Sequence, residues 1–435
     1  MTTHAMRALA REAFLHAVAE AGVGQAFARH VSYDRGVLRI CDDLYDLRSY
    51  ARVLVISFGK AGHAMAEALA SQTGPAIGGI VADPNQQAVQ IPGYRYFQGG
   101  HPHPNEESLR AASAILKSLS ALNSQSLALF MISGGGSAVV EKPVDEDISV
   151  DDLRATYRVL VQSGAPITQI NAVRKHLSAV KGGRMARAAQ GAQQVSILIS
   201  DVPENALDSL ASGPTMPDSS TAEDCYRIAA EHSMLRDFPA SVRELFEKRA
   251  LEETPKQDDA AFARSRWWKI LSSETAEKAA AEMIGRQGFT VEIDSSCDDW
   301  DFAKAADYLL ARLRTLKQRS ARACIVSGGE VTVRVAEPSG AGGRNQHFAL
   351  YCAEKIASEN IVVLSAGTDG IDGNSPAAGG VVDGTTAERA RIAGLDLPEH
   401  FRTFNAFPLL KKLDDVIQTG PTGTNVRDLR ILLAF

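Results

Sequence analysis

The sequence predicts an α/β protein built from parallel β-sheets flanked by helices, in two domains. Short β-branched runs alternate with helical patterns along nearly the whole chain, which is typical of parallel sheets covered by helices. The strand-sized runs are continuously apolar rather than alternating, as expected for strands buried on both faces. A polar stretch near residues 247–266 separates two strand–helix series. These three observations carry the prediction of the fold class.

The elements follow from these patterns in chain order. The expected strands are Arg52–Ser57, Leu127–Ser133, Gln194–Ser200, Trp268–Leu271, Thr290–Asp294, Arg322–Ser327, Val331–Val335 and Ile361–Ser365. The expected helices are Gly62–Ser71, Asn105–Ala121, Val150–Ser163, Gly183–Gln190, Thr275–Gly285, Asp301–Gln318 and Asn345–Ala357. An amphipathic helix also opens the chain, with Met6, Leu9, Ala13 and Val18 directed inward.

The domain boundary is predicted from the stretch EKRALEETPKQDDAAFARSR, which is polar, contains Pro255 and lacks apolar periodicity. Such a segment is typical of a linker or a long surface loop. We therefore expect an N-terminal domain over residues 1–247, a linker or loop over 248–266 and a C-terminal domain over 267–435.

Composition excludes several classes of protein. Hydrophobic residues make up 45% of the 435 residues and charged residues 23%, as in globular proteins and unlike disordered chains. There are 46 Lys and Arg residues against 52 Asp and Glu residues, a formal net charge of −6, so nucleic acid and anionic membranes are poor partners. The five cysteines are scattered with no C-x-x-C pair, which fits a reducing cytoplasm. We expect a cytoplasmic protein with no membrane span, and a transit peptide is the alternative for the arginine-bearing N-terminus.

Small and charged residues recur where apolar strands end. Four such runs are VLVISFGKAG, LALFMISGGGSA, ACIVSGGEV and IVVLSAGTDG, and a fifth, SILISDVPE, ends in Ser200 and Asp201. Ligands of open α/β sheets bind beyond the carboxyl ends of the strands. Any one of these turns has a structural explanation, but five together predict a ligand-binding crevice.

Glycine-rich loops supply candidate anion cradles, because successive backbone N–H groups can converge on a phosphate or carboxylate. The first cradle is residues 133–137 and the second is residues 339–346. The second contains Arg344, whose guanidinium suits bidentate binding of such groups. A third loop, residues 418–425, offers hydroxyls near the C-terminus. The residues of the first two cradles that we predict to bind phosphate or nucleotide are Ser133, Gly134, Gly135, Gly136, Ser137, Gly342 and Gly343.

Charged residues at the strand ends are the candidates for catalysis or metal binding. Lys60 lies where a strand meets a helix, and Asp201 follows a strongly apolar strand, where an acid is suited to bind Mg²⁺ or act as a general base. Glu330 and Asp369 hold equivalent positions later in the chain. For each residue alone, helix capping or ion pairing is an equal alternative. Asn345 follows Arg344 in the second cradle.

Arg174 and Lys181 belong to a basic cluster, NAVRKHLSAVKGGRMA, for which a substrate-binding or supporting role and a solvated surface are both open. His101 and His103 alternate with prolines, so they are extended and cannot form a helical pair of metal ligands. The segment TDGIDGNS has only part of the spacing of a calcium loop.

The absence of three well-known motifs disfavours three classes of enzyme. The chain has no G-x-x-x-x-G-K-[ST] loop, no complete G-x-G-x-x-G after a strand and no G-x-S-x-G elbow, which disfavours P-loop enzymes, dinucleotide dehydrogenases and α/β-hydrolases. Anion cradles with a Lys, an Asp and an Arg match phosphoryl transfer, which depends on positioning and charge neutralisation. The residues therefore predict a non-P-loop kinase.

A set of motifs, in one order from the first helix to the last strand, resembles the glycerate 2-kinase family, some of whose members are named hydroxypyruvate reductase. The motifs are FGKAG, HPHPNEES, MISGGGSA, NAVRKHLSAVKGGRMA, ISDVPENALDSLASGPT, SGGE, GGRNQHFAL, SAGTDGIDG and TGPTGTNVRDLRILL. The resemblance implies ATP- and Mg²⁺-dependent phosphorylation of (R)-glycerate to 2-phosphoglycerate. It also implies a larger Rossmann-like N-terminal domain, a C-terminal α/β domain and an active site in the cleft between them.

By the same resemblance Lys60, Asp201 and Arg344 are catalytic, and residues 134–137 bind phosphate. We expect Lys60 and Arg344 to neutralise the transferring phosphoryl group, and Asp201 to orient the substrate hydroxyl or hold Mg²⁺. One departure from the family pattern is Ser272-Ser273-Glu274, where an Asn is expected to open a helix. ATP and glycerate are the expected partners, and a homo-oligomer is possible.

Three alternatives remain open on the sequence alone. They are an NAD(P)H-dependent hydroxypyruvate reductase, a non-enzymatic sensor of sugar acids, and a kinase for a related small sugar acid, since pocket shape sets substrate choice.

Overall fold

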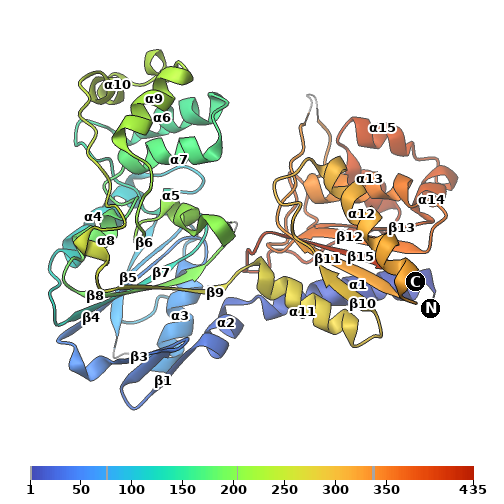
Figure 1. The fold of residues 1–435 in the computed structure, drawn as a ribbon, viewed down its shortest axis with the longest axis horizontal. Coiled ribbons are helices and arrows are strands. Elements are labelled where there is room, and N and C mark those ends of the chain that lie inside the picture. Colours follow the sequence, from blue (N-terminus) through green and yellow to red (C-terminus); the bar gives the residue numbers. More distant parts are fainter. Residues whose placement is uncertain (1, 75–76, 203, 336–338) are drawn as a thin grey trace. The chain divides into compact units, whose positions relative to one another are not determined.

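A computed structural model describes residues 2–74, 77–202, 204–335 and 339–435. The chain forms two compact units. The parallel-sheet unit spans Ala26–Ile270, and the mixed-sheet unit combines Leu271–Phe435 with the N-terminal segment up to Gln25. Each unit has its own six-stranded sheet, which can be followed in Figure 1. Each unit also has its own apolar core.

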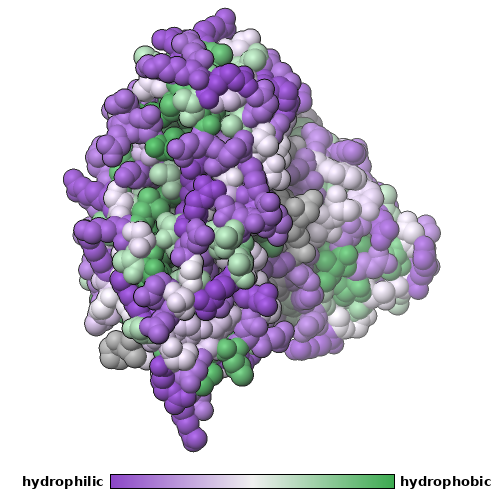
Figure 2. Space-filling view, turned by 60° about the vertical axis from the view of Figure 1, so that its left-hand side comes forward, coloured by the Kyte–Doolittle hydropathy of each residue, from purple (hydrophilic) through white to green (hydrophobic). Residues whose placement is uncertain are grey.

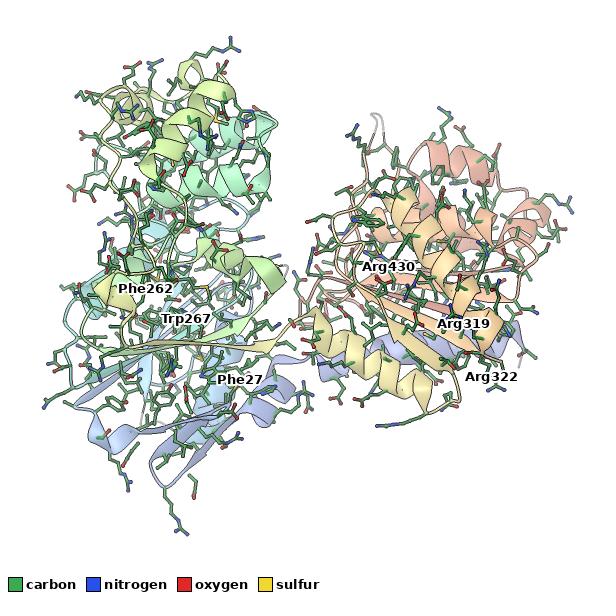
Figure 3. The ribbon with its side chains drawn as sticks, viewed as in Figure 1. Phe27, Phe262, Trp267, Arg319, Arg322 and Arg430 are labelled. Carbon is green, nitrogen blue, oxygen red and sulfur yellow. The ribbon has the colours of Figure 1, made fainter. Side chains whose placement is uncertain are left out.

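This division corrects the predicted domains at two places. Helix α1 (Thr3–Glu20) belongs to the mixed-sheet unit, where it packs on α11 (Ser273–Gly285) and β12 (Ile361–Gly367). Its amphipathic pattern shows that one face is buried but not which sheet buries it. Residues 248–266, predicted as a linker or a surface loop, lie within the parallel-sheet unit and do not join the two units. Phe262 of this segment packs against Trp267, with ring centroids 6.2 Å apart (Figure 3).

The central sheet of the parallel-sheet unit has the strand order β6-β5-β4-β7-β8-β9. Its members are β4 (Arg52–Phe58), β5 (Gly78–Asp83), β6 (Tyr94–Gln98), β7 (Ser126–Ile132), β8 (Gln193–Ile199) and β9 (Ser265–Leu271). The ladders that join β6 to β5, β5 to β4, β4 to β7 and β7 to β8 are all parallel. In chain order this is the 3-2-1-4-5-6 arrangement of Rossmann folds, with its switch point between β4 and β7.

The central strands of this sheet are buried on both faces, as their sequence predicts. Strand β7, for example, is apolar or small at every position and buried throughout. The helices around the sheet are α3 (Gly62–Thr73), α4 (Glu106–Leu119), α5 (Gly136–Val139) and α8 (Arg184–Ala188). Helix α4 begins at a capping box in which Asn105 and Ser108 satisfy each other's backbone N–H groups.

A second group of helices has a separate apolar core in the same unit. It consists of α6 (Val150–Gln162), α7 (Ile167–His176), α9 (Ala222–Glu231) and α10 (Ala240–Glu247), which gather above the sheet in Figure 1. Below the sheet in this view lies a small antiparallel sheet of β1 (Val31–Asp34), β2 (Val37–Ile40) and β3 (Asp43–Asp46), preceded by α2 (Val23–His30). None of these three strands was expected from the sequence.

The sheet of the mixed-sheet unit has the order β10-β11-β15-β12-β13-β14. Its other strands are β10 (Thr290–Ile293), β11 (Ala323–Gly328), β13 (Gly379–Asp383), β14 (Val416–Ile417) and β15 (Asp428–Ala434). Only β10 and β11 pair in parallel, and the remaining ladders are antiparallel. The α/β class is confirmed, but this sheet departs from the expected parallel arrangement because β15 returns between β11 and β12 in the opposite direction.

Helices cover both faces of this sheet. Figure 1 shows α1 and α11 below it and α12 (Phe302–Arg319) and α13 (Arg344–Lys355) above it. The remaining helices, α14 (Thr386–Ile392), α15 (Leu397–Arg402) and α16 (Ala406–Lys412), pack around α13. Arg430 of β15 is fully buried in this core, over the ring of Phe348 (Figure 3).

Most expected elements are present within two or three residues of their predicted ends. The clear error is Val331–Val335, which is no strand and has a single bridge from Thr332 to Asp301. Hydrophilic residues predominate on the face of the parallel-sheet unit that Figure 2 shows, with hydrophobic residues scattered among them. Among the described residues, no helix is both long enough and apolar enough to cross a bilayer.

Candidate active site

The loops after β4 and β7 meet at the switch point of the parallel sheet. Phe58 of β4 pairs with Ile132 of β7, so both strands end at the same level. The Lys60 N–H donates to the Gly134 carbonyl at 2.9 Å, and the Ala61 N–H donates to Ser133 Oγ at 3.0 Å. These bonds place Lys60, with its side chain exposed, beside the glycine loop. This is the region where open α/β sheets bind ligands.

The glycines of this loop permit a close approach by other side chains. A Cβ atom on Gly134 would lie 1.7 Å from Asp201 Oδ2, so only glycine leaves room for that carboxylate. Gly135 has φ +77°, and a Cβ there would lie 3.0 Å from Lys60 Cγ. The structure therefore brings together three predicted site features: Lys60, the 133–137 loop and Asp201.

His101 also lies at this loop, although the sequence argument left it out of the site. A Cβ on Gly135 would be 2.9 Å from His101 Cδ2 and 3.2 Å from its Nε2. The segment follows β6, a strand that was not predicted, so nothing in the sequence pattern placed it at the same edge of the sheet. The last two residues of the loop have structural roles. Ser137 Oγ lies 2.9 Å from Ser212 Oγ, and Gly136 begins α5.

The basic cluster 174–181 does not act as one surface. Lys181 is 1% exposed and forms an ion pair with Glu141, which also accepts hydrogen bonds from Tyr157 and Ser178. Lys181 therefore lies within the helical part of the unit, where its charge is matched. Arg174 stacks over the Tyr157 ring at 4.8 Å, and its buried Nε has no hydrogen-bond partner among the described residues.

In the mixed-sheet unit, Arg344 opens α13 and is held by two carboxylates. Its Nε and Nη2 donate to Asp428 at 2.6 and 3.1 Å, and Nη2 also lies 2.7 Å from Glu330 Oε1. Asp428 is buried, whereas Arg344 and Glu330 remain about one-third exposed. Burial and the neighbouring Asp428 raise the pKa of Glu330.

Asp372 caps the same helix. Its two carboxylate oxygens accept hydrogen bonds from the backbone N–H and the side-chain amide of both Asn345 and Gln346, at 2.9 to 3.3 Å. Burial raises the pKa of Asp372 to about 6. The resemblance of residues 368–375 to a calcium loop is thus explained by helix capping. Asn345 also accepts a bond from Ser365 Oγ at 2.6 Å, so both ends of its amide are used within the unit.

The loop of the second cradle is clamped against residues 372–374. Asn374 accepts a hydrogen bond from the Gly342 N–H at 2.8 Å and donates to the Gly340 carbonyl at 3.1 Å. A Cβ on Gly343 would lie 2.3 Å from Asp372 Oδ1, so this contact also requires glycine.

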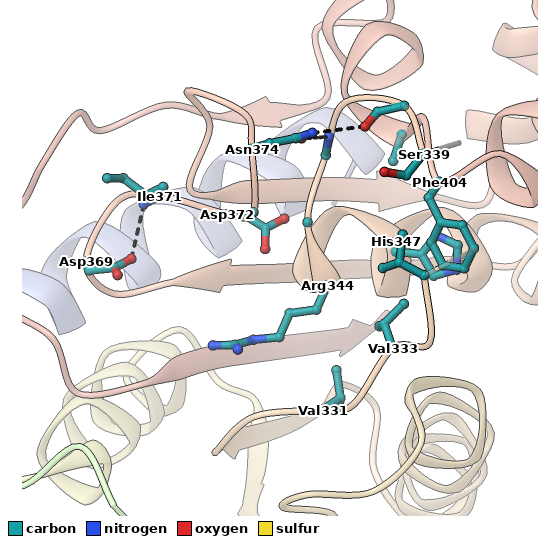
Figure 4. A pocket seen from close by; sticks show the side chains of 16 residues that line it. Val331, Val333, Ser339, Arg344, His347, Asp369, Ile371, Asp372, Asn374 and Phe404 are labelled. Atoms are coloured by element: carbon teal, nitrogen blue, oxygen red, sulfur yellow. Dashed lines mark hydrogen bonds between the residues drawn. The ribbon is translucent and has the colours of Figure 1, made fainter. Parts of the chain in front are cut away.

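A cavity of about 600 Å³ opens beside this loop, and Figure 4 shows the side chains that line it. Arg344, Asp369 and Asp372 contribute its charged groups, while Val331, Val333 and Phe404 are among its apolar ones. Asp369 Oδ1 accepts from the Ile371 N–H at 3.1 Å. The third predicted loop packs on this segment, because Thr422 donates to the Thr368 carbonyl at 2.6 Å.

Comparison with known proteins identifies the family. A model described as a domain of unknown function (DUF4147) matches residues 9–247, and the MOFRL family model matches residues 323–428. A protein of Thermotoga maritima named D-glycerate 2-kinase is 35% identical over 387 residues, which cover 87% of this chain and 90% of that protein. The chain belongs to the glycerate 2-kinase family. The resemblance carried by the motifs is confirmed.

Two further comparisons agree with this assignment. The solved structure of a glycerate kinase from Thermotoga maritima has a TM-score of 0.86 and 32% identity, and the match covers 99% of this chain and 100% of that one. A protein of Agrobacterium vitis named putative hydroxypyruvate reductase is 35% identical over 89% of this chain and 88% of its own length.

The sequence departure noted for the family lies at the start of α11. Ser272 is the N-terminal cap of this helix, is 5% exposed, and makes no side-chain capping bond. A capping residue whose side chain accepts no hydrogen bond from the first turn stabilises a helix less than one whose side chain does.

Proposed function

We propose that the chain transfers the γ-phosphoryl group of ATP to the 2-hydroxyl of (R)-glycerate, giving 2-phosphoglycerate. The observation that carries this proposal is the 35% identity, along 87% of the chain, to a protein named D-glycerate 2-kinase. The presence of Lys60, Asp201 and Arg344 at the positions that the family motifs predict supports it.

Phosphoryl transfer requires positioning of the reactants and neutralisation of the charge on the transferring group. Lys60 offers an exposed ammonium group beside backbone N–H groups of the switch-point loop, and loops of this kind bind phosphate oxygens. Arg344 presents a guanidinium already oriented by Asp428. A preoriented cation stabilises developing charge without reorganising during the reaction.

Asp201 fits the role of a Mg²⁺ ligand. Among the described residues no cluster of three or more His, Cys, Asp and Glu side chains could hold a metal ion. Mg²⁺ commonly binds through one or two carboxylates, with waters and substrate phosphates completing its shell, and Asp201 beside the Gly134 loop supplies such a carboxylate. Bound there, Mg²⁺ would neutralise phosphate charge. The alternative for Asp201 is to orient the substrate hydroxyl.

The test is a ³¹P NMR spectrum of the purified protein with ATP, Mg²⁺ and (R)-glycerate. We expect a new monoester signal matching 2-phosphoglycerate that is absent without Mg²⁺. A signal of 3-phosphoglycerate would keep the kinase but overturn the regiochemistry. A panel of related small sugar acids, compared by kcat/KM, identifies the preferred acceptor.

A second candidate, NAD(P)H-dependent reduction of hydroxypyruvate, is favoured by the strand order, which many dinucleotide-binding domains share. In those domains an acid at the end of the second strand binds the ribose. Here that position is Asp83, which is 3% exposed and accepts hydrogen bonds from the backbone of His63 and Asn85. Oxidation of NADH in the presence of hydroxypyruvate, followed by the loss of the NADH absorption band at about 340 nm, distinguishes this activity from the kinase.

A further inference from the structure

Three ionisable side chains meet the glycine loop at the switch point. Asp201 lies against Gly134, while Lys60 and His101 lie against Gly135. Lys60 and Asp201 were assigned to the site from the sequence, whereas His101 was not, and the fold places it beside them. Its ring makes no hydrogen bond within the described ranges, so both nitrogens are available to a ligand.

The backbone around His101 is anchored on both sides. The Gly100 N–H donates to Ser108 Oγ at 2.9 Å, which ties the segment to the first turn of α4. The Pro104 carbonyl accepts a bond from Arg154 Nε of α6 at 2.8 Å. A Cβ on Gly99 would lie 2.1 Å from the Val139 carbonyl, so the chain also presses closely on α5. The backbone that carries the exposed imidazole is therefore fixed at the edge of the loop.

The surroundings of His101 favour its neutral form. Partial burial lowers the pKa of His101, and the positive charges of Lys60 and His103 lower it further. A neutral imidazole carries an unprotonated nitrogen that can accept a proton, and a base whose pKa lies near the working pH is the most effective. An aspartate is ordinarily a much weaker base, with a pKa of about 3.9.

We propose that His101 is the general base that removes the proton from the glycerate 2-hydroxyl during phosphoryl transfer, a role that rests on the function proposed above. The hydroxyl O–H bond breaks and the proton passes to an imidazole nitrogen. The oxygen forms a bond to the γ-phosphorus, and the bond from that phosphorus to the bridging oxygen breaks. ADP leaves with the electron pair, and His101 then releases its proton to solvent.

This assignment separates the duties of the three side chains. Lys60 attracts the phosphoryl group and helps to lower the pKa of His101. Asp201 binds Mg²⁺ or orients the acceptor, and His101 accepts the proton. The step needs no co-reactant besides ATP and glycerate.

The test compares His101→Gln with His103→Gln as the matched control. Both histidines are exposed and lie two residues apart in the same segment, but only His101 lies against Gly135. We expect His101→Gln to lower kcat about 100-fold, the usual size of a general-base contribution, with little change in KM for ATP. His103→Gln keeps kcat near that of the wild type.

The dependence of kcat on pH tests the role of His101, because a purely structural role would leave this dependence unchanged. Because the pKa of His101 is lowered, wild-type kcat should fall only at acid pH, where His101 becomes protonated. This acid limb should be missing in His101→Gln and present in His103→Gln. Imidazole added to His101→Ala should restore part of the activity. Wild-type kcat and an unchanged acid limb in His101→Gln would overturn the proposal while leaving the kinase assignment intact.

Two controls keep the outcomes distinct. If the wild type forms no 2-phosphoglycerate, the proposed function itself fails, whatever the variants do. If circular dichroism shows that His101→Gln is unfolded, the test uses His101→Asn and the pH dependence of wild-type kcat instead. A wild-type pH profile without an acid limb rejects His101 as the base.

Discussion

Arg344 and Asp428 form a two-point ion pair, with Nε 2.6 Å from Oδ2 and Nη2 3.1 Å from Oδ1. Asp428 is the first residue of β15, and Arg344 is the first residue of α13. The pair therefore joins a helix start to the strand that fills the middle of the mixed sheet. Because two atoms of a planar group are held, the direction of the guanidinium is set as well as its position.

Arg344→Lys should abolish most activity without unfolding the protein. A lysine ammonium is a point charge that cannot bind Asp428 at two atoms and face a phosphoryl group at a fixed angle. We expect kcat to fall by about 10²- to 10³-fold, as for loss of a preorganised electrostatic group. Arg402→Lys is the control, because Arg402 forms an exposed pair with Glu399 in the same unit. Equal rates in both variants would remove Arg344 from the mechanism.

Lys60→Met should stop turnover and also change the pH profile of what remains. Loss of the ammonium removes a charge that stabilises the transferring phosphoryl group. It also removes a charge that lowers the pKa of His101, so the acid limb of the residual activity should move to higher pH. Steady-state rates between pH 5 and 8 check both effects, with the exposed Lys117→Met as the control. Wild-type turnover in a folded Lys60→Met protein would contradict the assignment.

The fold was predictable where local patterns and burial agree. Strand β7 is apolar throughout and was placed within one residue, and the capping box at Asn105 marks the start of α4. Residues 331–335 also alternate as a strand does, but they lie at the edge of a cavity, where no neighbouring strand pairs with them. The reversed direction of β15 is invisible in its sequence, because a strand buried on both faces is apolar in either orientation.

The proximity of Lys60, Gly134 and Asp201 was predictable, because each of them follows the end of a strand. The site was not predictable where the contact depends on tertiary packing. Asp372 was noticed only as part of a weak calcium pattern, yet it caps the helix of Arg344 from a loop 27 residues away. His101 was dismissed as a metal ligand, and only the position of β6 brings it to Gly135. For Lys181 the sequence left a substrate-binding or supporting role and a solvated surface open, because its buried partner Glu141 is 40 residues away.

Asp372 makes the stability of the mixed-sheet unit depend on pH. Its pKa is raised to about 6 in the folded protein, so the folded state binds a proton more tightly than the unfolded state. The stabilisation from that proton is complete below the unfolded pKa of about 3.9 and is lost as the pH rises through 6. Relative to Asp372→Asn, the wild type should lose up to about 3 kcal/mol of unfolding free energy between pH 4 and 7.

Urea denaturation of both proteins at several pH values measures this difference, with Asp369→Asn as the control from the same loop. The comparison uses the change with pH rather than the absolute difference, because an Asn at 372 also loses some of the four hydrogen bonds. A difference between wild type and Asp372→Asn that stays constant from pH 4 to 7 would show that Asp372 ionises normally.

Asp201→Asn distinguishes the two roles left open for this carboxylate. If Asp201 holds Mg²⁺, the variant should need a higher Mg²⁺ concentration for half-maximal rate, by about 10-fold or more, and saturating Mg²⁺ should restore much of kcat. If Asp201 orients the hydroxyl, the Mg²⁺ dependence should stay unchanged while kcat/KM for glycerate falls. Titrations of Mg²⁺ and of glycerate on the same protein give both answers. Chelation of Mg²⁺ should abolish the wild-type reaction in either case, since the ion neutralises phosphate charge. Wild-type behaviour in both titrations would exclude Asp201 from the active site and leave its contact with Gly134 as a packing feature of the loop.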